Sequence, residues 1–424
     1  MLDDFLTKHG PIERMQCVVT DPNGVARGKW LPGASLAKLF EAGVNLPLSI
    51  HALDVWGTEV HETGLHIASG DRDGVFRPVP HTLSPIRDGE AQVLLETFTT
   101  DGAPFDGCTR QALARVVERL GARGMNATAA FELEFHLLEA DGGVAEASGL
   151  REAQRMYDMD ALDRHRATLD RIARLAEAAE VPADTVVKEA APGQYEVNLV
   201  HRADDPLRSA DDAILLRRIV RSAANEAGLR ATFMPKPFAD EAGNGMHVHC
   251  SLTRDGPVFA DDDALTHAAC GLVETMAEAT LAFVSSFNGF RRLAPGSYAP
   301  THAAWGRNNR SVAVRVPTGA PRLEHRVAGA DANPYLVLAL VLEGMMRGLD
   351  AGRTIAEAEG DTYEHPAGAA LPARMEDSIA LWDGSDFVAR AVGETLRANL
   401  AHIKRAEHAR MSAQISDFER ATYL

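Results

Sequence analysis

Apolar and polar residues alternate with a period of two in several short segments, a pattern typical of half-buried β-strands. In residues 130–137 one face of the predicted strand is apolar and consists of Phe131, Leu133, Phe135 and Leu137. The opposite face carries Glu132, Glu134 and His136. Same-face side chains on a strand lie about 7 Å apart, so carboxylates at this spacing can each hold a separate cation of a neighbouring pair. Alone, the polar face could equally be a solvated outer surface.

Three further segments repeat this arrangement of polar groups. Residues 245–252 place His247, His249 and Ser251 opposite an apolar row. Residues 322–326 gather Arg322, Glu324 and Arg326 on one face. This alternation of sign suits a carboxylate metal ligand between anion-binding guanidiniums, and the alternative is a surface ladder of salt bridges. Glu189 and Glu196 flank a Pro-Gly turn at residues 192–193, which can direct both carboxylates toward one centre.

The N-terminal part of the chain has the pattern of a small β-rich unit. Two strand-like runs within residues 13–32 flank Asp21-Pro22-Asn23-Gly24, a tight-turn sequence that predicts a β-hairpin. A helix-like run at residues 34–42 and a strand-like run at 91–100 follow. Thr109 is then predicted to cap a helix that extends through residue 119. We place a domain boundary near residue 105, which gives domains at 1–105 and 106–424.

In the second predicted domain, long helical patterns alternate with the short β segments. These helical patterns cover residues 160–180, 209–227 and 334–348. Such alternation indicates an α+β fold with a mixed sheet.

Composition narrows the class of ligand. The formal net charge of −17 opposes non-specific attraction to nucleic acid or to an anionic membrane surface. There is no apolar run long enough to span a bilayer, and the N-terminal residues carry acids where a signal peptide needs bases. The four cysteines show no C-x-x-C spacing and suggest buried, reduced thiols. We therefore expect a cytoplasmic protein that binds small ligands, metals or other subunits.

Together the polar strand faces suggest a metal cage for phosphoryl chemistry. Five carboxylates and one imidazole form an oxygen-rich set suited to Mg²⁺ or Mn²⁺ rather than zinc: Glu132, Glu134, Glu189, Glu196, His247 and Glu324. Metals and arginines both neutralise charge on a transferring phosphoryl group. The arginines follow in a basic segment of the chain: Arg291, Arg292, Arg310, Arg315, Arg322 and Arg326. Neither a P-loop nor a dinucleotide-binding glycine fingerprint occurs.

At this point the sequence resembles the glutamine synthetase family. Lys236-Pro237-Phe238, a short spacer, Gly243-Asn244-Gly245-Met246-His247 and then Ser251 are similar to that family's ATP-region signature. Further similar motifs run in family order across residues 130–340: Glu132-x-Glu134, Gly193-Gln194-Tyr195-Glu196, Asn309-Arg310-Ser311 and Arg322-x-Glu324-x-Arg326. The resemblance implies a small N-terminal β-grasp domain and a large catalytic domain with a curved antiparallel sheet flanked by helices.

The resemblance also implies a role for each matching residue. One metal would lie on Glu134, Glu189 and Glu196, and a second on Glu132, His247 and Glu324. Glutamate would bind through Gly243, Arg292 and Arg326. ATP would be contacted by His249, Ser251, Arg310 and Arg315, and the implied catalytic arginines are Arg322 and Arg310. The implied reaction forms γ-glutamyl phosphate from glutamate and ATP, after which an amine displaces phosphate. Members of the family form rings, so a large homo-oligomer, expected to be a dodecamer, is implied.

Departures from the family pattern concern the amine. Tyr298 stands where ammonia-using members carry a glutamate, and Asp54 is a possible substitute for a second missing acid. Losing an acid weakens a cation pocket, while an aromatic ring can contact the carbon skeleton of a larger amine. We therefore hypothesise a γ-glutamyl ligase for an organic amine such as putrescine, another polyamine, ethanolamine or a monoamine. The alternatives are a true glutamine synthetase, a non-catalytic structural or regulatory relative, and a kinase that stops at the acyl phosphate.

Overall fold

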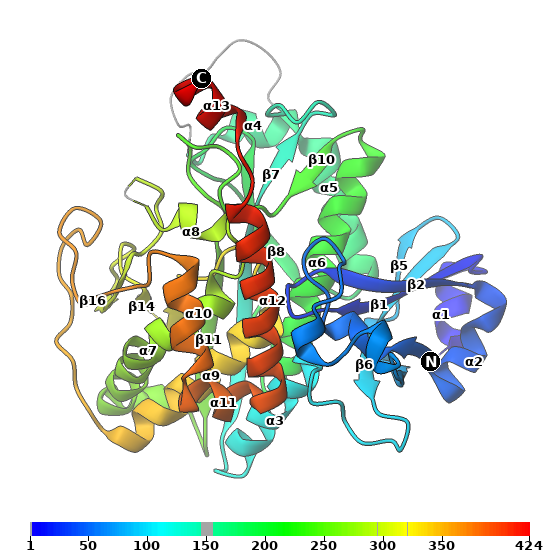
Figure 1. The fold of residues 1–424 in the computed structure, drawn as a ribbon, viewed down its shortest axis with the longest axis horizontal. Helices are drawn as coiled ribbons and strands as arrows, with labels where there is room; N and C mark the ends of the chain where they lie inside the picture. The colour runs from blue at the N-terminus through cyan, green and yellow to red at the C-terminus, as the bar shows by residue number, and fades with distance from the viewer. Residues whose placement is uncertain (1, 146–155, 295, 320) are drawn as a thin grey trace.

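Two large sheets and a set of helices make up the protein in the computed structural model, which describes residues 2–145, 156–294, 296–319 and 321–424. A six-stranded sheet near the N-terminus lies to one side of an eight-stranded sheet (Figure 1). A third, two-stranded sheet pairs β12 (His302–Ala303) with β16 (Ala369–Ala370). The α+β fold class predicted from the sequence is confirmed.

The six-stranded sheet has the order β2-β1-β6-β4-β3, and β5 also pairs with β6. Its strands are β1 (Arg14–Thr20), β2 (Ala26–Pro32), β3 (Val44–Pro47), β4 (Asp73–Pro78), β5 (Ser84–Arg87) and β6 (Glu90–Phe98). The predicted hairpin is confirmed, because β1 and β2 pair antiparallel and the Gly24 amide donates to the Asp21 carbonyl oxygen at 3.0 Å. Apolar residues of α1 (Leu2–His9) and α2 (Leu36–Ala42) join the core of this sheet.

The eight-stranded sheet has the order β13-β14-β15-β11-β7-β9-β8, with β10 paired to β7. Its long central strands are β7 (Asn126–Leu138) and β11 (Met246–Thr253), and β8 (Ala183–Lys188) and β9 (Gln194–Leu199) continue it on one side. The short strands are β10 (Arg230–Thr232), β13 (Trp305–Arg307), β14 (Val314–Val316) and β15 (Leu323–His325). The alternation predicted for β7 is confirmed, because the side chains of its apolar row are fully buried: Phe131, Leu133, Phe135 and Leu137.

Helices pack against the apolar side of this sheet and against one another. They include α3 (Thr109–Gly121), α4 (Met159–Arg164), α5 (Arg166–Ala178), α6 (Pro206–Glu226), α7 (Asp262–Phe283), α8 (Gly289–Arg292), α9 (Pro334–Ala351), α10 (Met375–Asp383), α11 (Asp386–Val392) and α12 (Glu394–Ser412). The last helix, α13 (Asp417–Tyr423), is exposed and buries none of its residues. Helix α9 is buried along most of its length and packs closely on α7. A Cβ at Gly271 of α7 would lie 2.5 Å from the Gly348 Cα of α9, so glycine is required for this close approach.

A buried ionic network fixes α3, α6 and α9 relative to one another. The Asp211 carboxylate of α6 accepts hydrogen bonds from Arg110 of α3 at 3.0 Å and from the Tyr335 hydroxyl of α9 at 2.6 Å. His81, which lies between strands β4 and β5, contacts the same carboxylate at 2.9 Å. Burial raises the pKa of Asp211, but Arg110 and the hydrogen bonds outweigh that effect and leave it below its usual range. The charge is therefore fully compensated.

Two local predictions were wrong. Thr109 is the first residue of α3 rather than its cap, because Cys108 occupies the N-cap position and the Thr109 hydroxyl donates to the Thr20 carbonyl oxygen. The helix predicted at residues 160–180 is two helices, α4 and α5, which are separated at His165. The domain boundary at residue 105 stays a prediction. All four cysteines are buried and unpaired, as expected, and no helix in the described ranges has the length and apolar character to cross a membrane.

Candidate active site

Cross-strand pairing brings the predicted site residues together on the polar face of the large sheet. On β7, Glu132 lies opposite His247 of β11, and Glu134 lies opposite Glu196 of β9. On β15, Glu324 lies opposite both His249 of β11 and Arg315 of β14. Directly opposed side chains have Cβ atoms about 5 Å apart, so the register alone gathers these groups within contact distance. Five strands, β7, β9, β11, β14 and β15, thus contribute to one centre.

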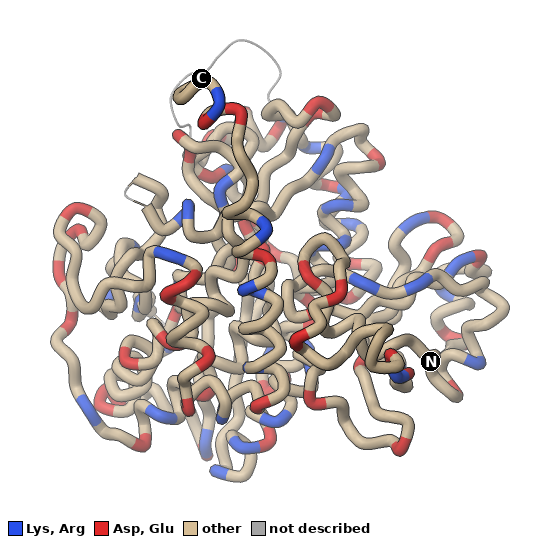
Figure 2. The backbone as a smooth tube through the Cα atoms, viewed as in Figure 1, with Lys and Arg blue, Asp and Glu red and all other residues tan. Residues whose placement is uncertain are grey.

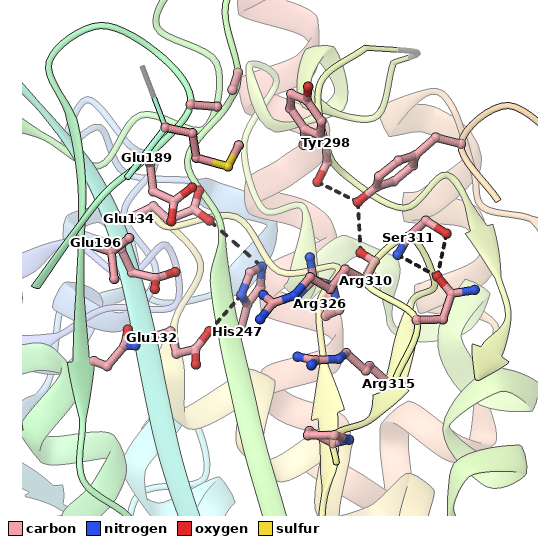
Figure 3. Close-up of a pocket in the computed structure, with 18 of the residues that line it drawn as sticks. Glu132, Glu134, Glu189, Glu196, His247, Tyr298, Arg310, Ser311, Arg315 and Arg326 are labelled. Carbon is pink, nitrogen blue, oxygen red and sulfur yellow. Dashed lines mark hydrogen bonds and ion pairs between the residues drawn. The ribbon is translucent and has the colours of Figure 1, made fainter. Parts of the chain in front are cut away.

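A cavity of about 800 Å³ opens above this centre. The carboxylates stand on one side of it and the arginines on the other, with His247 between them (Figure 3). Most of the residues predicted for the site line the cavity: Glu132, Glu134, Glu189, Glu196, Gly243, His247, His249, Tyr298, Arg310, Arg315, Arg322 and Arg326. Glu324 and Arg292 are buried beneath its floor.

Two groups of side chains have the geometry of metal sites. In the first, ligand atoms of Glu132, His247 and Glu324 all lie within 4.8 Å of one another, the set predicted for the second metal. In the second, the same holds for Glu134, Glu196 and His247. Glu189, predicted as a ligand with Glu134 and Glu196, lines the cavity but lies outside that close group. Carboxylate oxygens with a single imidazole match the ligand preference of Mg²⁺ and Mn²⁺.

Crowded carboxylates in this centre repel one another. Burial raises the pKa of Glu189 to about 7, and the charges of Glu134 and Glu132 contribute to the rise. Burial and the charges of Glu132, Glu134 and Glu189 raise the pKa of Glu196 well above its usual value. Bound divalent cations would supply the missing positive charge and favour the ionised forms. The residues therefore fit a divalent-metal centre.

Other carboxylates in the centre already have partners. Burial would raise the pKa of Glu132, but hydrogen bonds from His247 at 3.0 Å and His249 at 2.8 Å hold it well below its usual range. Glu324 accepts a hydrogen bond from Arg315 at 2.8 Å and another from Arg326. Despite burial, the charges of Arg326 and the two histidines lower the pKa of Glu324 to about 2.

Arg322 is linked to the metal side of the cavity through His249. Its Nε donates to His249 Nδ1 at 3.1 Å, and His249 Nε2 lies 2.8 Å from a Glu132 oxygen. Because Nδ1 accepts this hydrogen bond, the ring carries its hydrogen on Nε2, which donates a hydrogen bond to Glu132. This chain of contacts fixes the orientation of Arg322 beside the carboxylates.

Close backbone approach of Gly243 and Gly245 makes room for Arg292. The Arg292 side chain is 3% exposed, and its Nη1 donates to the Val327 carbonyl oxygen at 2.8 Å. A Cβ at Gly245 would lie 2.6 Å from Arg292 Nη2, so a side chain there would force this guanidinium to shift. Arg292 Nε has no partner among the described residues, so the guanidinium retains donor capacity. A carboxylate ligand would satisfy it.

Two predicted residues lie apart from the cavity. Asp54 accepts hydrogen bonds from the amides of Trp56 at 2.9 Å and Thr58 at 2.8 Å, and this loop does not line the cavity of the same chain. Ser251 follows His249 on β11 and lies opposite Thr128, beyond the cavity lining. Their roles at the amine and at ATP stay predictions.

Some residues of the cavity wall were not predicted. Tyr157, Asp361 and Tyr363 line it, and Tyr363 lies in the segment after α9 that is distant in sequence from the metal residues. The Tyr363 hydroxyl donates to the carbonyl oxygens of Tyr298 at 3.0 Å and Arg310 at 3.2 Å. Burial raises the pKa of Tyr363, and Arg326 opposes the rise. No spacing rule connects this tyrosine with the metal residues, so only the fold reveals its position.

A second, smaller cavity of about 280 Å³ adjoins the first and shares Tyr298 and Tyr363 with it. Their rings meet edge to face with centroids 6.2 Å apart. The other described residues that line it include Leu293, Ala294, Ala299, Pro366 and Leu371, and none of them is a carboxylate or a cation of fixed charge. The space beside Tyr298 is therefore mainly apolar.

Comparison with known proteins agrees with this geometry. Residues 106–423 match the family model of the glutamine synthetase catalytic domain. The chain is 37% identical to the γ-glutamylputrescine synthetase PuuA of Escherichia coli (strain K12), in a match that covers 98% of this chain and 91% of the relative. It is 29% identical to the glutamate–isopropylamine ligase of a Pseudomonas species, over 99% and 96% of the two chains. A solved structure of GmaS with ADP superposes with a TM-score of 0.88 at 27% identity, covering 100% of this chain and 99% of that one.

Proposed function

The chain belongs to the glutamine synthetase family and is a ligase, and from this premise we propose that it joins the γ-carboxylate of glutamate to an organic amine, using ATP. The position of Tyr298 is the observation that supports an organic amine, rather than ammonium, as the acceptor. Its ring lies in the wall of the large cavity, next to the smaller, mainly apolar cavity that adjoins it. An ammonium-selective site needs a carboxylate at this position.

Glutamate activation is supported by the division of charge within the cavity. Arg292 lies beside Gly243 and Gly245, and Arg326 lines the cavity together with Gly243. Both arginines are suited to bind the substrate's carboxylates through paired hydrogen bonds. Divalent cations held by the carboxylate groups would neutralise the phosphates of ATP. Arg310, Arg315 and Arg322 face the same space and would stabilise charge on the phosphoryl group as it transfers to the γ-carboxylate. The acyl phosphate so formed is then open to attack by an amine.

Accommodation of an organic amine is supported by the two tyrosines. Tyr298 is 49% exposed and has a backbone φ of +53°, a left-handed conformation that costs non-glycine residues about 1 kcal/mol. The Tyr363 hydroxyl, through its hydrogen bond to the Tyr298 carbonyl oxygen, helps to hold this conformation. The aromatic faces of the tyrosines and the smaller apolar cavity suit the carbon skeleton of an amine. The relatives named for putrescine and isopropylamine support the same class of acceptor.

An amine panel tests this proposal. Purified protein would receive ATP, glutamate and Mg²⁺ or Mn²⁺, with ammonium, methylamine, isopropylamine, ethanolamine or putrescine as acceptor. We expect a γ-glutamyl amide with at least one organic amine at concentrations where ammonium gives almost none. Preferred turnover of ammonium would refute the organic amine as acceptor but would leave the ligase reaction standing. Complete absence of glutamate-dependent phosphate release with every acceptor would refute the ligase reaction.

Substitution of Tyr298 provides the matched comparison. Tyr298→Glu introduces the missing acid and should raise kcat/KM for ammonium while lowering it for the preferred organic amine. Tyr298→Phe keeps the ring and should preserve the preference for the organic amine. Equal preferences in the two variants would show that Tyr298 does not select the acceptor.

We further propose that the working enzyme is a ring-shaped homo-oligomer, as the family resemblance implies, and that Asp54 reaches the cavity of a neighbouring copy. The position of Asp54 away from its own chain's cavity supports this arrangement. Light scattering that reports a monomer would contradict it.

A further inference from the structure

A basic cavity of about 340 Å³ lies between the six-stranded sheet and helix α6, and its lining shares no residue with the candidate active site. Five cationic side chains line it: Arg27, Lys29, Arg87, Arg218 and Arg221. Among the described lining residues none is acidic. Lys and Arg positions recur along the part of the chain that contains β1, β2 and β5 (Figure 2). In a chain with a net charge of −17, such a concentration of positive charge is unexpected.

Three of the five cations lack a carboxylate partner. Arg27 is paired with Asp21 at 2.9 Å, and the Lys29 ammonium donates to the Asn45 carbonyl oxygen. In contrast, the described part of the chain offers no carboxylate within 4.0 Å of Arg87, Arg218 or Arg221.

Neutral groups hold these three guanidiniums in place. Arg218 donates to the amide oxygens of Gln92 at 2.6 Å and Gln16. Arg87 donates to the Ser222 hydroxyl at 3.2 Å, and Arg221 stands over the Phe233 ring at 5.0 Å. These contacts orient the cations without neutralising their charge.

The uncompensated charges destabilise one another. Burial lowers the pKa of Arg218 to about 10, and repulsion from Arg221 and Arg87 adds to the fall. The adjoining cavity contains two acidic residues: Glu407 is paired with Lys404 at 2.8 Å, and burial raises the pKa of Asp331, which disfavours its charged form. Arg218 is half-buried while Arg87 and Arg221 are exposed, so an anion from solution can reach all three charges and relieve their mutual repulsion.

We infer that this cavity is a binding site for a small anion with two or more negative charges, held by Arg87, Arg218 and Arg221. Guanidinium groups bind carboxylate and phosphate oxygens through the same paired hydrogen bonds, so a dicarboxylate and a phosphate group are both members of this chemical class. The ligand would contact β5 and α6 together, since Arg87 ends β5 and Arg218 and Arg221 lie on α6. The inference does not depend on the proposed ligase reaction.

Thermal unfolding and calorimetry of the full chain test the site with defined anions. In a chloride buffer, inorganic phosphate or glutarate at millimolar concentration should raise the Tm of the native protein, while acetate at equal ionic strength should not. Arg221→Gln should raise the Tm in chloride alone, because it removes one of the repelling charges. The same variant should weaken binding of the active anion at least about tenfold, since a charge-assisted hydrogen bond is lost.

Two control variants separate this cavity from the other anion sites. Arg353→Gln removes an exposed arginine that lies near Glu274, and it should change neither the Tm in chloride nor the affinity for the anion. Arg326→Gln alters the candidate active site and should leave the anion-induced shift in place. An equal shift in Arg221→Gln and native protein, loss of the shift in Arg326→Gln, or the absence of a shift with both anions would each overturn the inference.

Discussion

Glu196→Gln tests whether the carboxylates of the cavity form one coupled metal centre. Burial and neighbouring carboxylates raise the pKa of Glu196 well above its usual value, so the folded protein keeps this side chain in its neutral, protonated form to a higher pH than an exposed glutamate. Glutamine resembles this neutral form. As the pH rises through this raised pKa the native side chain ionises, and the repulsion that its charge adds is absent in the variant.

The neighbouring Glu189 sets the scale of the effect. A pKa raised from 4.5 to about 7 corresponds to roughly 3 kcal/mol of destabilisation once the group is ionised. Because the folded state retains the proton longer than the unfolded state, this contribution lowers the free energy of unfolding as pH rises from the unfolded pKa to about 7. We therefore expect Glu196→Gln without metal to match the native protein at about pH 5 and to exceed its stability by about 1–3 kcal/mol at about pH 8.

Urea unfolding in EDTA at both pH values measures this difference. Other groups titrate as well, notably the buried histidines His51, His136 and His325, whose pKa values are lowered by burial and whose contributions have the opposite sign. Comparing variant with native protein at the same pH cancels their effect. Glu62→Gln, which removes an exposed carboxylate, serves as the control and should show no such difference.

Addition of Mg²⁺ or Mn²⁺ at about pH 8 should make the native protein more stable than the Glu196→Gln variant. Bound metal stabilises the native protein by about 3 kcal/mol at a hundredfold excess over Kd, and the variant, lacking one ligand, should gain less. A variant that is no more stable than native protein in EDTA, or that gains equally from metal, would show that Glu196 does not belong to a coupled metal centre.

Three further substitutions probe the proposed catalytic role of Arg322, the contact between Gly245 and Arg292, and the buried network around Asp211. Arg322→Ala should lower kcat about 10²–10³-fold with little change in Tm, as expected for a group that stabilises developing charge, and an unchanged kcat would exclude that role. Gly245→Ala should raise the KM for glutamate, because the new Cβ would lie 2.6 Å from Arg292 Nη2; an unaltered KM would place glutamate elsewhere. Asp211→Ala should destabilise the fold by about 2–3 kcal/mol in urea unfolding, since it removes one of the two carboxylate partners of Arg110 and leaves the buried Tyr335 hydroxyl without its acceptor. The exposed ion pair of Arg123 provides its control, because Asp350→Ala should cost less than about 1 kcal/mol.

Strand periodicity made much of the site predictable from sequence. Alternation in β7 assigned Phe131 to the core and Glu132 to the cavity face, and that assignment holds because one face of the strand is buried. The same logic placed His247 and Glu324 correctly on the polar face of their strands. Periodicity could not supply the register between strands, which decides that Glu132 lies opposite His247.

Elsewhere, tertiary contacts decided what local sequence could not. The Thr109 hydroxyl bonds the Thr20 carbonyl oxygen, a partner remote in sequence, so the capping rule fails there. Tyr363 enters the cavity through a loop whose position depends on hydrogen bonds to Tyr298 and Arg310. The uncompensated cations of Arg87 and Arg218 become apparent only when the small sheet is placed against α6. Such features depend on which segments pack together.

Product analysis by mass spectrometry in a competition assay tests the central claim most directly. Glutamate, ATP and Mg²⁺ would be supplied together with equimolar ammonium and a panel of organic amines. The account predicts a γ-glutamyl amide of an organic amine as the main product, with matching release of ADP and phosphate and little glutamine. Glutamine as the main product, or ADP and phosphate release that does not require glutamate, would contradict it.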